Sequence, residues 1–360
     1  YYLGLYNKLY THSRETAYAT DINTQNPPLS VIIVAKDATH ELQENLPFIL
    51  EQDYPEFEVI VIYDRPADDC DNTLKLLEDK YPNLYHTFIP DSARSHKKLG
   101  ITMGIKASRH EWLVFTEPDC RPQSNQWLKQ MARNFTPATE IVLGYSNYEK
   151  VPGWFNKKIT FDTLLNSMRY LGMAVSGHPY MGTGRNMAYR KTLYYKQKGF
   201  ASHLNLQRGE DDLFINETAR AHNTRVEASP ESLMRIAMPK YKRIWCEEKI
   251  SYAATSRLFH GTARYLMGFE TCSRFLFYTA IIATITISIL LHQWTIAAIA
   301  VLLWLARFTM QLIVFRKTAK VFGERKFCAL LPLFDFLQPA WNGVFKLQRK
   351  FRRKNEFMRK

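Results

Sequence analysis

Apolar runs alternate with amphipathic segments through the first 148 residues of the chain. Residues 29–35 (LSVIIVA) and 57–63 (FEVIVIY) are continuous apolar runs, which is typical of strands buried on both faces of a sheet. The segment between them, 39–52, places its leucines and its isoleucine on one helical face. Strands that alternate with amphipathic helices predict βαβ units, and therefore an α/β fold built on a mostly parallel sheet.

The same alternation continues after residue 64. It predicts a helix over 71–82, a strand over 84–90, a helix over 94–108, and strands over 112–116 and 141–148. Beyond residue 150 the alternation is lost. Residues 150–250 are richer in Gly, Pro and polar side chains, as expected of an active-site half built from loops.

Residues 275–315 are far more apolar than the rest of the chain. No formal charge lies between Phe275 and Leu291, and a second apolar run starts after the tripeptide His-Gln-Trp. The 41 residues of this region are enough for two membrane spans of roughly 20 residues each. We therefore predict transmembrane helices at about 275–292 and 294–315. The alternative is a buried helical hairpin in a soluble core.

Basic residues flank this apolar region on both sides. Arg274 precedes it, and Arg316, Lys317 and Lys320 follow it, so the positive-inside rule predicts that both ends are cytoplasmic. A charge at depth is costly, so Arg307 is expected to face a partner helix or to reach toward the interface. The expected location is a membrane, the bacterial inner membrane, crossed more than once, with the domain that precedes the spans in the cytoplasm.

A third apolar patch, residues 327–341, contains Asp335 and two prolines. A full crossing there would place the basic tail outside, so we interpret the patch as an interfacial or re-entrant segment. The chain begins at Tyr1 without an initiator Met, and a further segment, such as another span, is expected upstream.

The net charge of +14 is concentrated at the end of the chain. The last fifteen residues carry eight Lys or Arg and one Glu, which indicates anionic membrane lipids as a partner. Nucleic acid is excluded as a partner because these cations are not interleaved with aromatic residues on a predicted sheet. The five cysteines are scattered and odd in number, which fits a reducing compartment and shows no zinc-site spacing.

Acidic residues follow the predicted strands. Asp37 and Asp64 come after the first two, and Glu117 and Asp119 end the strand in EWLVFTEPDCRP. Ligands gather at the carboxyl ends of strands in an open parallel sheet. Two close carboxylates repel each other unless a cation lies beside them, so a metal ion or a cationic side chain is expected there. The alternatives are a helix N-cap for Asp37 and an ion pair with Arg121 for the acidic pair.

Five segments, in this order, resemble the family 2 glycosyltransferases, which are inverting enzymes. The resemblance covers about residues 29–235 and is carried by LSVIIVAKD, FEVIVIYDRPADD, SHKKLGITMGIKASRHEWLVFTEPDC, MGTGRNMAYRK and GEDDLFINETA. It implies the GT-A fold of nucleotide-diphospho-sugar transferases, with a mostly parallel Rossmann-like sheet, here followed by transmembrane helices. It also implies transfer of a sugar from a nucleotide-sugar donor, with UDP the commoner nucleotide, to a lipid-linked or envelope glycan acceptor.

The resemblance assigns roles at the donor end. Ala35 closes the opening strand beside the nucleotide, and Asp64 is the acid that reads the nucleobase, with Tyr63 in place of the family's preceding Asp. The family's Asp-x-Asp strand end binds Mg²⁺ or Mn²⁺, which grips the diphosphate. Here that motif reads Glu-x-Asp. Asp119 is therefore the expected metal ligand, and Glu117 is either a further contact to the metal site or a contact to the ribose.

The segment GEDD (209–212) supplies the expected catalytic acids. Asp211 corresponds to the family's base, which takes the proton of the acceptor hydroxyl, and burial near Glu210 and Asp212 would raise its pKa toward a useful range. Which of the three acts as the base is left open. The alternative is that these acids only complement the dipole of the helix that follows.

Cationic and glycine residues complete the predicted donor site. Lys97 and Lys98 would meet the diphosphate, although lysines on helices are usually only solvated. Gly184 belongs to a Gly-Thr-Gly wall beside the donor sugar, and Arg185 is a plausible anion contact.

One family feature is missing. Processive members carry Gln-x-x-Arg-Trp near the membrane, whereas here Arg243 and Trp245 stand in another order and residues 248–252 take that place. Addition of a single sugar is therefore expected rather than processive synthesis. For Trp245 the alternative to sugar stacking is a place in the interfacial aromatic belt.

The expected organisation has three parts. Residues 1–28 form a juxtamembrane segment, residues 29–250 form the catalytic domain, and residues 251–360 form the membrane region with its basic tail. Within the catalytic domain, 29–148 is the nucleotide-binding half and 149–250 the acceptor half. The competing function is a degenerate homologue that binds nucleotide as a scaffold for polysaccharide assembly.

Overall fold

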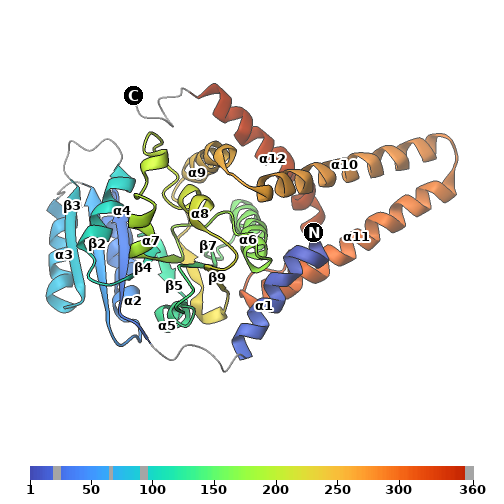
Figure 1. The fold of residues 1–360 in the computed structure, drawn as a ribbon. Coiled ribbons are helices and arrows are strands. Elements are labelled where there is room, and N and C mark those ends of the chain that lie inside the picture. The colour runs from blue at the N-terminus through green and yellow to red at the C-terminus, as the bar shows by residue number, and fades with distance from the viewer. Residues whose placement is uncertain (19–25, 65–67, 90–95, 353–360) are drawn as a thin grey trace.

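A seven-stranded sheet runs through the centre of the protein (Figure 1). The computed structural model describes residues 1–18, 26–64, 68–89 and 96–352. The strand order is β3-β2-β1-β4-β8-β6-β9. The strands are β1 (Leu29–Ala35), β2 (Phe57–Asp64), β3 (Leu84–Ile89), β4 (Trp112–Thr116), β6 (Ile141–Gly144), β8 (Met187–Arg190) and β9 (Thr224–Glu227).

The sheet is mostly parallel. Strand β1 pairs in parallel with β2 and β4, β2 with β3, and β6 with β9, whereas β8 runs antiparallel between β4 and β6. Nearly every residue of β1 and β2 is buried, because helices cover both faces of the sheet. Burial on both faces explains the continuous apolar runs in these strands. The prediction of a mostly parallel α/β sheet is confirmed.

Of the helices that surround the sheet, α2 (Thr39–Leu50), α3 (Asp68–Lys80) and α4 (His96–Ala107) follow from the same alternation. The others are α5 (Trp127–Ala132), α7 (Lys191–Lys196), α8 (Asp212–Thr218) and α9 (Lys242–Thr255), with the short helices η2 (Ala201–His203), η3 (Pro230–Ser232) and η4 (Ser256–Leu258). Helix α4 lies very close to β1, because a Cβ atom on Gly104 would lie 2.6 Å from Ile32 Cγ2. Glycine is needed there for close contact rather than for its backbone freedom.

A small second sheet stands beside the first. It contains β5 (Cys120–Pro122), β10 (Met234–Ile236) and β7 (Ser146–Tyr148), in the order β5-β10-β7. Strand β5 starts directly after Asp119, whose carbonyl accepts a 2.8 Å hydrogen bond from the Ala237 N–H. The acidic pair therefore lies on the corner where the chain leaves the large sheet for the small one.

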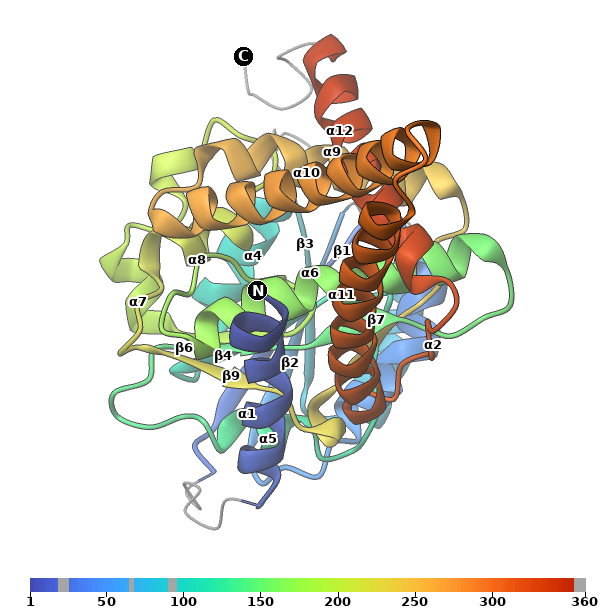
Figure 2. The ribbon, with the colours of Figure 1, turned by 90° about the vertical axis from the view of Figure 1, so that its right-hand side faces the viewer.

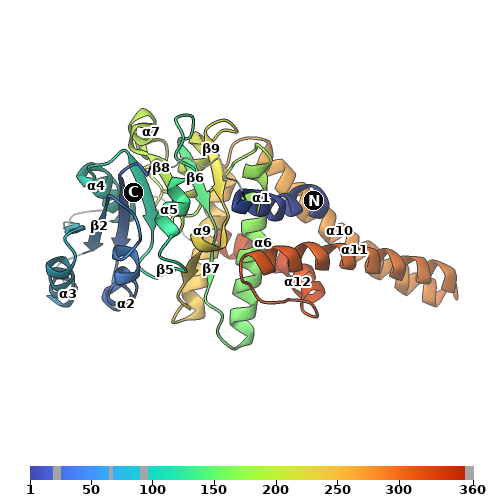
Figure 3. The same ribbon diagram turned by 90° about the horizontal axis from the view of Figure 1, so that it is seen from below.

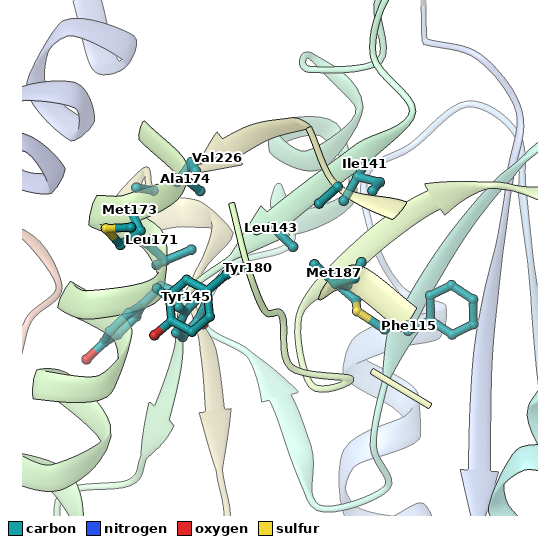
Figure 4. Packing of buried hydrophobic residues seen from close by; sticks show 14 of the residues in the cluster. Phe115, Ile141, Leu143, Tyr145, Leu171, Met173, Ala174, Tyr180, Met187 and Val226 are labelled. Carbon is teal, nitrogen blue, oxygen red and sulfur yellow. The ribbon is translucent and has the colours of Figure 1, made fainter. Parts of the chain in front are cut away.

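The segment predicted to be loop-rich contains a 22-residue helix, α6 (Trp154–Val175). It packs against β7 and β9 and lies behind α1 and α11 in Figure 2. Its apolar side chains join those of β6 and β9 in one core, as Leu171, Leu143 and Val226 show in Figure 4. Most of its circumference is buried, including polar residues such as Asp162 and Arg169, so its sequence lacks the one-sided apolar pattern of a surface helix.

The N-terminal segment is packed onto the domain. The π-helix η1 (Tyr2–Tyr6) leads into α1 (Asn7–Tyr18), and both contact α6 and the long helix α11. Tyr6 and Leu9 are fully buried there. At Gly172 of α6 a Cβ atom would lie 2.9 Å from the carbonyl oxygen of Leu5, so a larger residue would push the two helices apart.

Two long helices project from the domain as a hairpin (Figures 1 and 3). Helix α10 (Thr262–Leu290) and helix α11 (Trp294–Val321) each contain an apolar window of 18 residues, with mean hydropathies of 1.7 and 2.0. By length and composition both could cross a membrane. Only 17% and 22% of their apolar windows are buried, which argues against the alternative of a soluble core hairpin. Which side of a membrane the domain occupies stays a prediction.

The patch at 327–341 forms the beginning of α12 (Leu331–Phe351), with Pro339 inside the helix. Helix α12 packs against α9 and α10. Its Asp335 is fully buried and accepts hydrogen bonds from three elements, η1, α10 and α11. The donors are Tyr2 (3.0 Å), Arg274 (3.0 Å), Tyr278 (2.7 Å), Gln311 (2.8 Å) and Arg307 (3.5 Å). Arg307 thus faces its partner helices, one of the two arrangements expected for it.

Replacing Asp335 by alanine is expected to destabilise this junction. The change leaves the buried Arg274 without its closest carboxylate, which should cost about 3–5 kcal/mol of unfolding free energy. Thermal unfolding of the detergent-solubilised protein measures the loss. The control is Asp79→Ala, at an exposed position of α3. Equal midpoints for the two variants would show that the Asp335 cluster does not hold the junction together.

Candidate functional site

A cavity of about 380 Å³ opens beyond the carboxyl end of β4. We call it the central cavity. Five segments meet in it: α4, the residues that follow β4, the loop before β8, the loop before α8, and one face of α9. Its lining comprises Lys97, Glu117, Asp119, Arg185, Arg208, Gly209, Glu210, Asp211, Asp212, Ile244, Glu247, Glu248, Ser251, Tyr252 and Thr255.

The pairing of β4 with β8 brings Glu117 and Arg185 together. The two strands are antiparallel with Phe115 opposite Met187, so the residues just beyond each strand face each other. Arg185 Nε lies 3.0 Å from one oxygen of Glu117, and Lys97 Nζ lies 2.6 Å from the other. Burial alone would raise the pKa of Glu117, but these two cations hold it well below its usual range.

Asp119, two residues further on, is in a different electrostatic position. Its Oδ1 accepts a 3.4 Å hydrogen bond from the Cys120 thiol, and no ion pair joins it to any residue the structure describes. Burial raises the pKa of Asp119 to about 6; Arg185 opposes this rise and the charge of Glu117 adds to it. The alternative ion pair with Arg121 is not found, because Arg121 pairs with Glu149 at 2.6 Å.

The loop before α8 supplies the second group of acids. Glu210 lies 3.0 Å from Lys97 Nζ. Asp211 caps α8: its Oδ1 accepts from the Asp212 N–H at 2.8 Å, and its Oδ2 accepts from the Gly184 N–H at 3.0 Å and the Tyr252 hydroxyl at 3.2 Å. Burial, followed by the negative charge of Glu210, raises the pKa of Asp211.

Asp212 has a structural position within the same loop. It is fully buried, and its carboxylate accepts from the Leu213 N–H at 2.8 Å and from the Thr255 hydroxyl. These bonds tie the beginning of α8 to the end of α9. Of the three acids, Asp211 is therefore the one held beside the cavity by donors from two other segments.

Helix α9 closes the cavity with one polar face. Ser251, Tyr252 and Thr255 follow Glu248 by three, four and seven residues, so all four lie on the same side of the helix. Both oxygens of Glu248 accept from Arg185, at 2.7 and 3.0 Å. In the sequence, residues 248–252 take the place of the Gln-x-x-Arg-Trp motif, but none of them was predicted as a site residue, although their spacing was the signal that could have identified the face.

The family of the chain can be decided from its sequence. Residues 2–346 match the family model of glycosyl transferase family 21. The chain belongs to glycosyl transferase family 21. The match supports a glycosyltransferase, as expected from the motifs, but it does not support family 2 specifically. A search of curated protein sequences gave no match.

A solved structure shares the fold of this family 21 protein. A mannosyltransferase from Pyrobaculum calidifontis, in complex with GDP-Man and Mn²⁺, is 15% identical, with a TM-score of 0.59 over 97% of this chain and 96% of that chain. At this identity the likeness shows the fold alone, and it confirms the GT-A prediction. S. aureus TarS 1–349 is 19% identical, with a TM-score of 0.44 over 66% of this chain and 68% of that chain.

Of the residues predicted for the donor site, Lys97, Glu117, Asp119 and Arg185 meet in the central cavity. Gly184 joins them through its N–H bond to Asp211. The structure does not bring Lys98 to the cavity. Its buried ammonium donates to the carbonyl oxygens of His203 (2.6 Å) and Leu206 (2.9 Å), because the neighbour of Lys97 on a helix faces another direction.

The predicted nucleotide contacts lie further along the sheet edge. Ala35 and Asp64 end β1 and β2, and Asp64 lies 3.6 Å from Lys36 Nζ. Tyr63, which replaces an acid of the family 2 motif, donates a 2.7 Å hydrogen bond to Asp71. Trp245 is buried, with Phe155 and Phe345 edge-on against its ring, so it is not an exposed belt residue. The roles of Ala35 and Asp64 stay predictions.

The residues present suit a divalent ion held by few protein ligands. No group of three or more His, Cys, Asp or Glu within the described ranges has a metal-binding arrangement. Mg²⁺ is commonly held by one or two carboxylates plus substrate phosphates and water. Asp119, a carboxylate with no cationic partner among these residues, fits that pattern. Glu117 fits it less well, because each of its oxygens already has a cation.

Removal of the Thr255 hydroxyl should loosen the closure of the cavity. In Thr255→Val the shape is kept, but the buried Asp212 loses a donor, which should lower the free energy of unfolding by about 1–3 kcal/mol. The control is Ser251→Ala, whose hydroxyl donates only to the carbonyl of Glu247 one turn earlier. Denaturation of both variants in detergent measures the two free energies of unfolding. Equal decreases would show that the hydrogen bond from Thr255 to Asp212 does not add stability beyond that of an ordinary helix-surface hydroxyl.

Proposed function

We propose that the chain is a membrane-anchored, metal-dependent, inverting glycosyltransferase. It moves a sugar from a nucleotide-sugar, a UDP-sugar by preference, to a lipid-linked or envelope glycan acceptor, one sugar at a time. The observation that carries the proposal is that Asp119 and Asp211 line one cavity of a GT-A fold. Asp119 comes from the end of β4 and Asp211 from the beginning of α8, so a donor-side and an acceptor-side acid converge.

At the donor end the chemistry requires stabilisation of the leaving diphosphate. Lys97 and Arg185 supply positive charge beside Asp119. Both are paired with carboxylates, and phosphate oxygens would compete with those carboxylates for the two cations. Mg²⁺ or Mn²⁺ held by Asp119 would add Lewis-acid stabilisation of the same charge. The GDP-Man and Mn²⁺ bound by the Pyrobaculum mannosyltransferase support a donor and a metal of these kinds. Ala35 and Asp64 would contact the nucleoside.

At the acceptor end Asp211 is the proposed base. Transfer with inversion is one in-line displacement: the acceptor oxygen bonds to the anomeric carbon while the bond to the diphosphate breaks, and the acceptor proton goes to Asp211. A buried carboxylate with a raised pKa holds that proton better than a solvated one. The Gly184 N–H and the Tyr252 hydroxyl fix the carboxylate in place. Glu210 and Asp212 flank the base and set its electrostatics.

A second cavity gives the acceptor a route to the membrane helices. It has a volume of about 670 Å³, and α6, α9, α10 and α12 contribute to its walls. We call it the acceptor cavity. Arg185, Glu248 and Tyr252 line both this cavity and the central cavity. An amphiphile in the acceptor cavity would lie between the proposed base and α10, the first of the two helices long and apolar enough to cross a membrane.

The proposed orientation places the catalytic domain in the cytoplasm, where nucleotide-sugars are available. Basic residues at both ends of the α10–α11 hairpin support this by the positive-inside rule, and the basic end of the chain would contact anionic lipids.

One observation favours the competing function, a nucleotide-binding scaffold without catalysis. Both oxygens of Glu117 are taken by cations, so the strand end offers one available carboxylate where family 2 enzymes have two. Metal-dependent hydrolysis of a nucleotide-sugar separates the two functions, because a scaffold would bind the nucleotide and leave it intact.

Nucleotide binding is expected to require both metal and Asp119. One of UDP, GDP and CMP should raise the unfolding temperature of the detergent-solubilised protein in the presence of Mn²⁺, and the shift should vanish with EDTA. Asp119→Asn should lose the shift, because an amide is a poor ligand for a hard cation. Asp79→Asn, at an exposed position of α3, should keep it. No shift with any nucleotide, in folded protein, would contradict the donor site.

Asp211→Asn is expected to separate binding from chemistry. The variant should keep the shift given by nucleotide and Mn²⁺, while release of nucleotide from the nucleotide-sugar should fall by about 100-fold or more without the base. The matched control is Asp53→Asn, an exposed acid on the loop after α2. Undiminished turnover in Asp211→Asn would remove Asp211 as the base. No turnover even in the unmodified protein would favour the scaffold.

A further inference from the structure

Five basic side chains line the acceptor cavity without ion-pair partners. We call them the cationic mouth: Arg257, Arg264, Lys346, Arg349 and Lys350. They come from η4, from the first turn of α10 and from the last turns of α12, three elements that the fold brings together. Within the described ranges, none of the five forms an ion pair. Segments far apart in the sequence thus place like charges around one cavity.

The other cations of the same cavity are neutralised. Arg169 pairs with Glu270 at 2.7 Å, Arg185 pairs with Glu248 at 2.7 Å, and Lys249 pairs with Asp162. The cavity lining contains one acid, Glu248, and Arg185 already occupies both of its oxygens. The deep cations therefore serve the fold, whereas the charge of the mouth has no counter-charge in its own lining.

The mouth cations are also close enough to repel one another. Partial burial of Arg349, followed by the charge of the neighbouring Arg257, lowers the pKa of Arg349, as expected of two guanidinium groups that lie near each other at the edge of the cavity. Like charges in such a place raise the energy of the empty site, and an anion that enters it relieves the repulsion. Guanidinium groups also suit phosphate by geometry, because their N–H donors bind two oxygens at once.

The rest of the cavity suits the apolar part of such a ligand. Tyr170, Tyr180, Phe259 and Met267 contribute to its lining. Next to Arg264, the side chains of Tyr265, Leu266 and Phe269 are exposed on α10, the helix that continues as a candidate membrane span. Apolar side chains of α10 are therefore found both in the cavity lining and on the exposed surface of the same helix.

We propose that the cationic mouth binds the phosphate group of a membrane amphiphile whose apolar part occupies the acceptor cavity. The proposal rests on the function proposed above in one respect, that this amphiphile is the acceptor and presents its hydroxyl to Asp211. The mouth selects an anionic headgroup, and the cavity selects a chain. Free inorganic phosphate offers the same chemistry to the mouth without the chain.

The test is a binding measurement on the full chain in neutral detergent, without any nucleotide. Dioctanoyl phosphatidic acid is compared with dioctanoylglycerol, which has the same chains and no phosphate, and with inorganic phosphate. Phosphatidic acid should bind about tenfold more tightly than either comparator. Arg257→Ala/Arg349→Ala should weaken its binding by about 25-fold, since each cation near an anionic lipid contributes roughly a fivefold factor.

The matched control is Lys317→Ala/Lys320→Ala. These two exposed lysines at the end of α11 lie outside the cavity lining, and their loss removes the same charge near the membrane. The control should bind phosphatidic acid as the unmodified protein does. An equal loss in both double variants would reduce the effect to general membrane attraction and overturn the proposal, as would equal affinity for dioctanoylglycerol.

Two further outcomes are distinguishable. If inorganic phosphate binds as tightly as phosphatidic acid, binding at the cationic mouth does not need the acyl chains of the lipid. That result would overturn the proposal that the ligand is an amphiphile. The shift given by nucleotide and Mn²⁺, measured on the same samples, reports the donor site independently. A normal nucleotide shift together with no lipid selectivity would reject the lipid site and leave the proposed transferase standing.

Discussion

The site depends on a chain of alternating charges, one buried and four partly buried. Glu210, Lys97, Glu117, Arg185 and Glu248 follow one another in space, and each inner member touches an opposite charge on both sides. A buried charge without partners costs several kcal/mol, so none of these residues can move independently. Because they come from the α8 loop, α4, the end of β4, the loop before β8 and α9, their mutual neutralisation holds five parts of the fold in one arrangement.

The residues outside this chain are the chemically available ones. Asp119 and Asp211 adjoin it without being neutralised by it, and burial raises the pKa of both. A carboxylate that is buried but not ion-paired favours a proton or an added cation over the bare charge. The same compensation that fixes the scaffold therefore leaves two acids of the central cavity able to interact with a ligand.

The sequence predicted what depends on local pattern and missed what depends on packing. Strands β1, β2 and β4 were predictable because burial on both faces leaves an unbroken apolar run, and Glu117 and Asp119 were predictable because they end one. Helix α6 was missed because it is buried nearly all round. The ion pair between Arg185 and Glu248 joins residues 63 apart, and only the antiparallel pairing of β8 with β4, together with the docking of α9, brings them together.

Two cavities that share a wall cannot be independent. Arg185, Glu248 and Tyr252 line both, and Arg185 is bound on one side by Glu117 and on the other by Glu248. A phosphate that draws Arg185 toward the central cavity would leave Glu248 less neutralised beside the acceptor cavity. Since Tyr252 donates to Asp211 from that same wall, a shift of α9 in response would change the environment of the proposed base. The position of α9 thus connects the charge of the donor, the ligand of the acceptor cavity and the carboxylate between them.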